Sequence, residues 1–203
     1  IPFGITPYYL SLMDREPSRK WDHAVRAQVI PPLSYVKEVL RSRSDPSSSL
    51  DFMMEGQTSP VDLVTRRYPV IAIFKPYNTC AQICVYCQRN WEIEGVLSED
   101  AMAPPEKIDA ALDWFEGHPA VTEVLVTGGD PAILANGQLR SMLGRLGSMP
   151  HIKRMRFGTR VPVVMPMRID EGFLGLLAEL HDPPRREFAL VTHFEHPYEV
   201  TPE

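Results

Sequence analysis

Short apolar runs typical of buried strands alternate with helical patterns from residue 67 to the end of the chain. Strands are predicted at residues 70–74, 123–127, 152–157 and 187–192. The i, i+3, i+4, i+7 spacing of apolar side chains predicts amphipathic helices at residues 108–115, 139–146 and 173–180. Strands that alternate with such helices form βα units, in which right-handed crossovers join parallel strands. The sequence therefore predicts an α/β fold built on a parallel sheet.

Residues with strong preferences for helix ends mark these predicted helices. Pro105 suits the first turn of the first helix, where a missing N–H leaves no hydrogen bond unmade. Asn136 is a candidate N-cap and Gly147 a candidate C-cap of the second helix. The third helix is expected to begin after Asp170.

The first part of the chain has a different character, which divides the sequence at about residue 66. Residues 34–40 have a short helical pattern, and residues 42–60 are rich in Ser, Asp, Pro and Gly, as irregular loops are. We therefore expect residues 1–66 to form a mainly helical or irregular extension with a linker, and residues 67–203 to form the α/β unit.

Composition excludes several classes of protein. The net charge of −5 argues against a nucleic-acid partner, and no apolar run is long enough to cross a membrane. Three cysteines in one cluster do not make a secreted disulfide framework, so a reducing, cytoplasmic location is expected. The chain begins at Ile1 without a methionine or a signal peptide, and we expect it to be a piece of a longer polypeptide.

Cys80, Cys84 and Cys87 lie within eight residues, in a loop expected after the first strand. Three thiolates on one loop suit three corners of a cubane iron–sulfur cluster and leave one iron open for a small molecule. A zinc site completed by His118 or His193 is an alternative, as are a redox pair of Cys84 with Cys87 and three inert buried thiols.

The loops after the other strands also carry polar groups and glycines. Gly128-Gly129-Asp130 follows the second strand, Gly158-Thr159-Arg160 the third, and His193 the fourth. The carboxyl ends of parallel strands meet at one edge of a sheet, where functional residues of such folds gather. We therefore expect these loops to form one site with the cysteines, although two glycines alone also suit a tight strand-to-helix turn.

Six blocks of the sequence now point to a known family. Residues 80–87 (CAQICVYC), with Tyr86 just before the last cysteine, resemble the signature of the radical S-adenosylmethionine (SAM) enzymes. The chain resembles the lysine 2,3-aminomutase family more closely, in residues 5–14 (ITPYYLSLMD), 67–69 (RYP), 124–130 (VLVTGGD), 158–169 (GTRVPVVMPMRI) and 192–197 (THFEHP). The five blocks besides the cysteine motif occur in the same order as in the family, and they identify it far more specifically than the three cysteines do alone.

The resemblance implies a partial (βα)6 barrel, similar to a TIM barrel, that holds a 4Fe–4S cluster and SAM at its mouth. One electron from an external flavodoxin- or ferredoxin-like donor then cleaves SAM to a 5′-deoxyadenosyl radical. That radical takes hydrogen from a small amino-acid substrate bound to pyridoxal 5′-phosphate (PLP), and the amino group migrates from C2 to C3. The protein would be a cytoplasmic isomerase, and the resemblance leaves a homo-oligomer open.

The resemblance also implies roles for individual residues. The cluster ligands are Cys80, Cys84 and Cys87, and Arg89 grips the substrate carboxylate. The groups assigned to the cluster and SAM pocket are Tyr86, Gly128, Gly129, Asp130, Arg160 and His193, and those assigned to PLP are Arg67 and Tyr68. Structural alternatives stay open: a helix-start carboxylate for Asp130, strand-end polar groups for Arg160 and His193, packing for Arg67 and Tyr68, and a loop ion pair for Arg89.

The sequence departs from the family at several positions. Gln88, Asn90 and Trp91 stand around Arg89 where the family usually has arginines, and Ile71 replaces a second arginine after Arg67. The lysine that binds PLP in the family has no counterpart in these residues. These departures keep two alternatives open, a PLP-independent radical SAM enzyme and a non-catalytic iron–sulfur protein.

Overall fold

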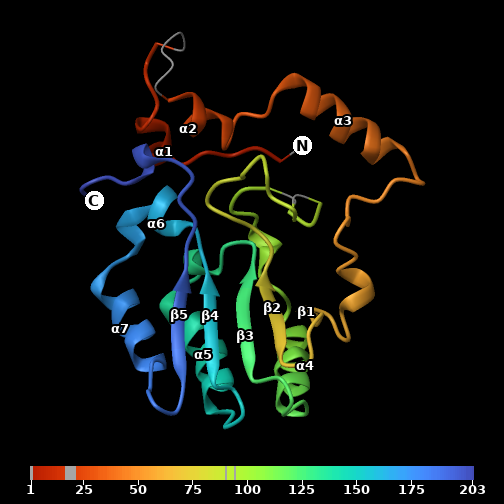
Figure 1. Ribbon diagram of the computed structural model, residues 1–203, viewed down its shortest axis with the longest axis vertical. Helices are drawn as coiled ribbons and strands as arrows, with labels where there is room; N and C mark the ends of the chain where they lie inside the picture. Colours follow the sequence, from red (N-terminus) through yellow and green to blue (C-terminus); the bar gives the residue numbers. More distant parts are fainter. Residues whose placement is uncertain (1, 17–21, 90, 94) are drawn as a thin grey trace.

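The computed structural model describes residues 2–16, 22–89, 91–93 and 95–203. Its centre is a five-stranded sheet whose strands follow one another in chain order. The strands are β1 Val64–Thr65, β2 Ile71–Tyr77, β3 Glu123–Gly128, β4 Arg154–Gly158 and β5 Glu187–Val191. β1 runs antiparallel to β2, and the other neighbours are parallel. The four parallel strands therefore end at one edge, at the top of Figure 1.

The helices of the βα units cover one face of this sheet. They are α4 Pro105–Glu116, α5 Asn136–Ser148 and α7 Glu171–Leu180, with the short α6 Val161–Val164 after β4. Figure 1 shows α4 and α5 behind the strands. Alternate strand residues point into this layer because side chains of a strand alternate between its faces. Phe74 of β2 packs edge-on against Phe115 of α4, with ring centroids 6.0 Å apart, and Phe157 of β4 packs against Phe173 of α7 at 6.3 Å.

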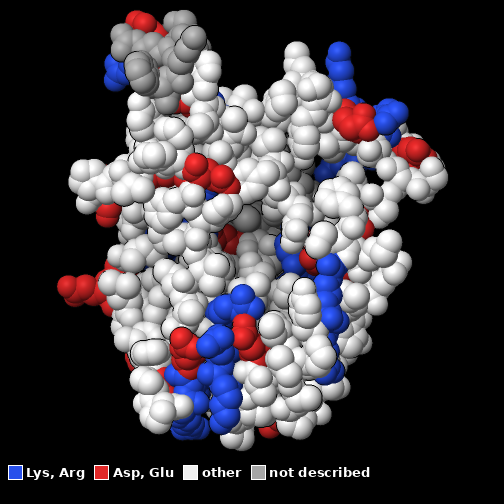
Figure 2. Space-filling view, in the orientation of Figure 1, with Lys and Arg blue, Asp and Glu red and all other residues white. Residues whose placement is uncertain are grey.

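The opposite face of the sheet carries charged side chains near the amino ends of the strands. Arg156 Nε lies 2.6 Å from Glu123 Oε1, and Arg154 Nε lies 2.7 Å from Glu187 Oε2. Figure 2 shows acidic and basic side chains together on the lower part of this face. Strand neighbours with opposite charge support the parallel register, in which Glu123 pairs with Arg154 and Arg154 with Glu187.

Residues 2–16 and 22–44 lie at the carboxyl edge of the sheet, and residues 45–66 run down beside it and end with β1 (Figure 1). They contain α1 Pro7–Ser11, α2 His23–Ala27, α3 Leu33–Ser44 and the 3-10 turn η1 Gly56–Thr58. Figure 1 shows α1 and α2 above the ends of the parallel strands. Tyr9, Val25 and Val29 form a second small core with Ala81 of the cysteine loop and Val163 of α6. The extension is thereby packed onto the loops that follow β2 and β4.

Most expectations of local structure are confirmed, with two differences at the ends of α5 and one additional strand. Asp170 caps α7 by accepting a hydrogen bond from the Phe173 amide at 2.7 Å. The predicted N-cap Asn136 is wrong, because Ala135 holds that position and Asn136 begins α5. The predicted C-cap Gly147 is also wrong, because α5 continues to Ser148 and Met149 caps it. The two-residue strand β1 was not expected.

The α/β prediction is confirmed, and the sheet is mixed because of β1. In the described ranges β1 and β5 are its two edges, so the closure of a barrel is not observed. No helix of the described residues has the length and apolar character needed to cross a membrane.

Candidate active site

The three cysteines lie in the loop after β2, and all are partly buried. Burial raises the pKa of the Cys80 thiol, and so does the charge of Asp130 and of the other two cysteines. Burial also raises the pKa of Cys87. The three cysteines stand within eight residues of one another on this loop.

The thiols fit a cluster better than a single metal ion. Among the described residues, no three His, Cys, Asp or Glu side chains converge as the ligands of one ion do. Zinc needs four donors at about 2.0–2.3 Å from one centre, whereas a cubane takes each thiolate at a different iron. Partly buried thiols on one loop are the soft ligand set that a cubane requires.

Gly128 and Gly129 bring the turn after β3 against the chain just before Cys80. Gly128 has φ +121°, and a Cβ on Gly129 would lie 2.1 Å from the carbonyl oxygen of Thr79. The Gly129 amide donates to Tyr77 O at 2.7 Å, and the Asp130 amide donates to Thr79 O at 2.8 Å. The close backbone approach that the glycines allow is therefore made by the protein's own chain.

Asp130 joins the loops after β3 and β4. Its Oδ1 accepts from the Thr159 hydroxyl at 2.6 Å and the Ala132 amide at 3.1 Å, and its Oδ2 accepts from the Arg160 amide at 2.8 Å. Burial raises the pKa of the carboxyl group, while these hydrogen bonds act in the opposite direction. The structural role considered for Asp130, a carboxylate at a helix start, is confirmed, because it caps the 3-10 turn η3 Pro131–Ile133. A contact with SAM stays a prediction.

Arg160 and His193 reach the cysteine loop from the ends of β4 and β5. Arg160 Nη1 lies 3.0 Å from Cys84 Sγ and also donates to the Tyr86 hydroxyl. The His193 ring packs edge-on against Tyr86, with centroids 5.9 Å apart, and His193 Nε2 lies 3.0 Å from Glu195 Oε1. The prediction that four strand-end loops meet at one edge is confirmed by these contacts.

Arg89 lies in a buried network of four charged side chains. Its Nη1 is 2.7 Å from Glu55 Oε2 and 3.2 Å from Glu92 Oε2. Lys75 Nζ lies 3.1 Å from Glu55 Oε2 and 3.1 Å from Glu92 Oε1. The loop ion pair considered for Arg89 is therefore present. The Lys75–Glu92 pair connects the cysteine loop to β2, and the Arg89–Glu55 pair connects it to the extension.

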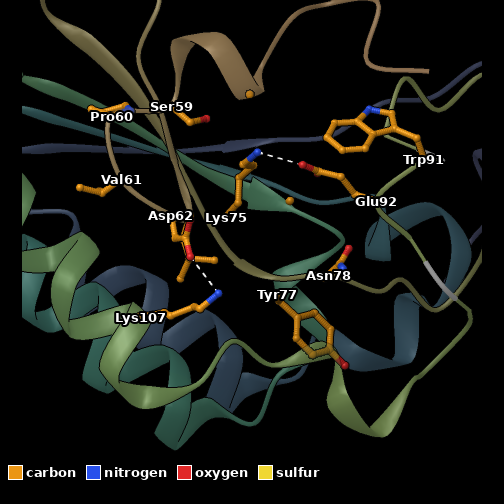
Figure 3. Close-up of a pocket in the computed structure, with 13 residues that line it drawn as sticks. Ser59, Pro60, Val61, Asp62, Lys75, Tyr77, Asn78, Trp91, Glu92 and Lys107 are labelled. Carbon is orange, nitrogen blue, oxygen red and sulfur yellow. Dashed lines mark hydrogen bonds and ion pairs between the residues drawn. The ribbon is translucent and has the colours of Figure 1, made fainter. Parts of the chain in front are cut away.

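A cavity of about 590 Å³ lies beside this network. Figure 3 shows the Lys75–Glu92 pair on one side and the Lys107–Asp62 pair, 2.8 Å apart, on another. Its wall also includes Trp91 of the cysteine loop and Gly128 at the end of β3. Sequence reasoning missed Glu55, Lys75 and Glu92. A lysine inside an otherwise apolar strand was a signal for Lys75 alone.

Arg67 and Tyr68 do not join the other predicted site residues. They precede the amino end of β2, whereas the cysteine loop follows its carboxyl end. The Tyr68 side chain is exposed. Seven residues of extended strand separate the two places, roughly 20 Å at about 3.3 Å per residue.

No family model matches the chain, but comparison with known proteins finds relatives that are similar along its whole length. It is 50% identical over 205 residues to an uncharacterized KamA family protein of Methanocaldococcus jannaschii, covering 100% of this chain and 32% of that protein. It is 37% identical to an L-lysine 2,3-aminomutase of Fusobacterium nucleatum, over 98% of this chain and 43% of the relative. It is 33% identical to a glutamate 2,3-aminomutase of Clostridioides difficile, over 99% of this chain and 43% of the relative.

The chain thus spans about a third to under a half of the length of these relatives. The matches extend from one end of the chain to the other, as the six ordered sequence blocks do. Along its whole length the chain is therefore homologous to a part of the longer proteins of the lysine 2,3-aminomutase family, as its motifs predicted.

Proposed function

We propose that the protein is a radical SAM aminomutase that acts on a small amino acid in the cytoplasm. The observation that carries this proposal is the contact of Arg160 and His193 with the loop of three partly buried cysteines, at the carboxyl edge of the sheet. The aminomutase relatives support the same reaction class. We also propose that the parallel strands are part of a (βα)6 barrel in the full-length protein.

In this proposal Cys80, Cys84 and Cys87 hold a 4Fe–4S cluster. Such a cluster would supply one electron to SAM, whose C5′–S bond would then break to give methionine and the 5′-deoxyadenosyl radical that takes hydrogen from the substrate. The chain's own residues orient the reactants and exclude water. The Gly128-Gly129 turn fixes the start of the cysteine loop through Tyr77 and Thr79, and we assign the SAM amino group to the neighbourhood of Asp130.

Arg89 is proposed to bind the substrate carboxylate. It stands two residues after Cys87, so its side chain begins beside the cluster ligands. A planar guanidinium can fix both oxygens of a carboxylate. Because Glu55 and Glu92 already lie near its Nη1, a substrate carboxylate must displace one of them or bind at another edge of the guanidinium. The cavity beside Lys75 gives the substrate room to enter.

PLP is proposed as a further cofactor of the full-length protein, because the family's aminomutases use it. Arg67 and Tyr68 are assigned to its phosphate and ring. Their position at the amino end of β2 means that PLP must extend toward that end, or that these residues act elsewhere. A flavodoxin- or ferredoxin-like protein is proposed as the electron donor, and a homo-oligomer is compatible with the proposal.

The test is anaerobic reconstitution of the full-length protein with iron and sulfide. We expect one cubane cluster by electron paramagnetic resonance (EPR), cleavage of SAM to methionine and 5′-deoxyadenosine, and conversion of lysine, glutamate or arginine to its β-isomer. Alanine at any of the three cysteines should remove the cluster. Stoichiometric zinc, together with iron loading that Cys80→Ala does not change, would refute the cluster assignment.

One alternative has an observation in its favour. Gln88 and Trp91 stand where the family has arginines, Ile71 replaces another, and Arg67 with Tyr68 lies far from the cysteines. These features favour a radical SAM enzyme that does not use PLP. A full-length protein that cleaves SAM, contains no PLP and isomerises none of the amino acids would establish that alternative. A cluster that never cleaves SAM would instead indicate a non-catalytic iron–sulfur protein.

A further inference from the structure

Arg160 is in contact with three separate segments of the chain, and one contact is to a cysteine sulfur. Its side chain is 12% exposed, on the loop between β4 and α6. Nη1 lies 3.0 Å from Cys84 Sγ and donates to the Tyr86 hydroxyl, while Nη2 lies 2.6 Å from Glu199 Oε1. The fold thus directs one N–H of a buried guanidinium at a cluster ligand.

Glu199 holds this guanidinium in place. Its side chain is fully buried, and Oε1 also accepts from the Tyr9 hydroxyl at 2.6 Å. Oε2 accepts from the amides of Glu195 at 2.6 Å and His196 at 3.3 Å. Both oxygens are engaged, so the carboxylate has one orientation. A buried charge pair with all these hydrogen bonds fixes the position of both partners.

The aromatic rings on either side restrict Arg160 further. The guanidinium carbon lies 5.8 Å from the Tyr9 ring centre and 5.5 Å from that of Tyr86. Positive charge over aromatic faces is favourable, more so when water is excluded. Arg160 therefore has little freedom to turn toward a bound ligand. To bind the carboxylate of SAM with both terminal nitrogens, it would have to leave a buried ion pair, which is strongly unfavourable.

A hydrogen bond to a ligand sulfur has a known effect on an iron–sulfur cluster. Donors to the sulfur atoms, and positive charge nearby, favour the reduced cluster because it carries more negative charge. This stabilisation of the reduced cluster is large where the surroundings are poorly solvated. Glu199 reduces the net positive charge but does not remove the N–H that faces Cys84.

We propose that Arg160, held by Glu199 and Tyr9, is a positioning residue that donates to the Cys84 sulfur and raises the reduction potential of the cluster. This inference rests on the proposed function only in requiring that the three cysteines hold a cluster. It gives Arg160 a role different from the SAM or substrate contact that sequence reasoning assigned to it. It also connects the extension and the segment after β5 to the ease of reducing the cluster.

The test is an EPR-monitored redox titration of the full-length protein, reconstituted anaerobically. Arg160→Gln removes the charge and is too short to retain the contact with Cys84. We expect a lower midpoint potential at unchanged iron and sulfide content. An Arg160→Gln cluster with the wild-type potential overturns the inference. A wild-type protein that forms no cluster overturns the proposed function instead, so the two failures are distinct.

Arg168 provides a matched control on the 3-10 turn η4 Pro166–Arg168. Its side chain is 16% exposed and donates to Leu134 O at 3.0 Å and to Asn136 Oδ1 at 2.5 Å, without a contact to a cysteine. Arg168→Gln removes a similarly buried guanidinium, and we expect it to leave the potential unchanged. An equal shift in both variants would show a general effect of losing an arginine and would overturn the inference.

Arg160→Lys covers the case in which the Gln variant loses its cluster. Lysine keeps the positive charge but lacks the planar fork that reaches Cys84 and Glu199 together. We expect a midpoint potential below that of the wild type, and above that of Arg160→Gln where both hold a cluster. A lysine variant with the wild-type potential overturns the inference, because the directed hydrogen bond would then have no effect.

Discussion

Gly129 lies so close to Thr79 that a methyl group on it would be 2.1 Å from the Thr79 carbonyl oxygen. Gly129→Ala should therefore push the β3 turn away from the cysteine loop. We expect a loss of about 1–3 kcal/mol in the free energy of unfolding, as for other overpacked sites, and a lower cluster content. Urea unfolding and iron analysis measure these effects.

Gly144 is the control for this change. It lies within α5, and a Cβ there would meet nothing within 4 Å. Gly144→Ala should raise stability by about 0.5–1 kcal/mol, because alanine is the better helix former. Equal free energies of unfolding for Gly129→Ala and Gly144→Ala would contradict the close approach of Gly129 to Thr79.

The network around Arg89 predicts a large effect at Glu55, far from the cysteines in sequence. Glu55 is 4% exposed and lies beside both Arg89 and Lys75. Glu55→Ala should cost about 3–5 kcal/mol, because two buried positive charges lose a partner. Glu38→Ala removes the exposed partner of Arg41 on α3, and no measurable loss is expected there. Equal denaturation midpoints for the two variants would contradict the buried network.

Asp130→Asn tests whether this carboxylate also serves SAM. The amide keeps one acceptor for Thr159 but removes the negative charge. We expect SAM binding to weaken by ~10-fold, on the scale of one charge-assisted hydrogen bond. Asp170→Asn is the matched change at another cap, and it should leave SAM affinity unaltered. An unchanged affinity in Asp130→Asn, measured by calorimetry, would limit Asp130 to its structural role.

Arg89→Lys separates substrate binding from radical formation. Lysine keeps the charge near Glu55 and Glu92, so the cluster and the cleavage of SAM should survive. Amino migration should fall by ~100-fold, because one bidentate contact in the reacting complex is lost. Arg140→Lys, at an exposed ion pair with Glu179, should have no such effect. Amino migration at the wild-type rate in Arg89→Lys would contradict the proposed binding of the substrate carboxylate by Arg89.

The parts of the fold that local patterns encode were predictable. Apolar runs located the four parallel strands, and the order of the loops predicted which residues meet at their carboxyl ends. Helix ends were less certain, because tertiary contacts decide them. The carbonyl of Gly147, the expected cap, instead accepts a hydrogen bond from Arg186, which lies 39 residues later in the sequence. The strand β1 has two residues, too few to form a pattern.

The partners of the predicted site residues could not be predicted. Glu55 lies in an irregular stretch, and nothing in its neighbourhood in the sequence shows that it meets Arg89. Tyr9 and Glu199 are 190 positions apart, so no periodicity connects them. Sequence patterns indicate which face of an element is buried, but a polar contact between loops depends on how the whole chain packs.

The hydrogen bond between Tyr9 and Glu199 has a practical consequence for handling the protein. Removing the chain up to residue 10 would take away the phenol that donates to Glu199, and removing it from residue 199 onward would take away Glu199 itself. Either cut is made far along the chain from Cys84, yet both would release Arg160 beside it. With the proposed cluster bound, cleavage of the full-length protein in either of these segments should therefore be detected first as a change in the colour and lifetime of the cluster in air.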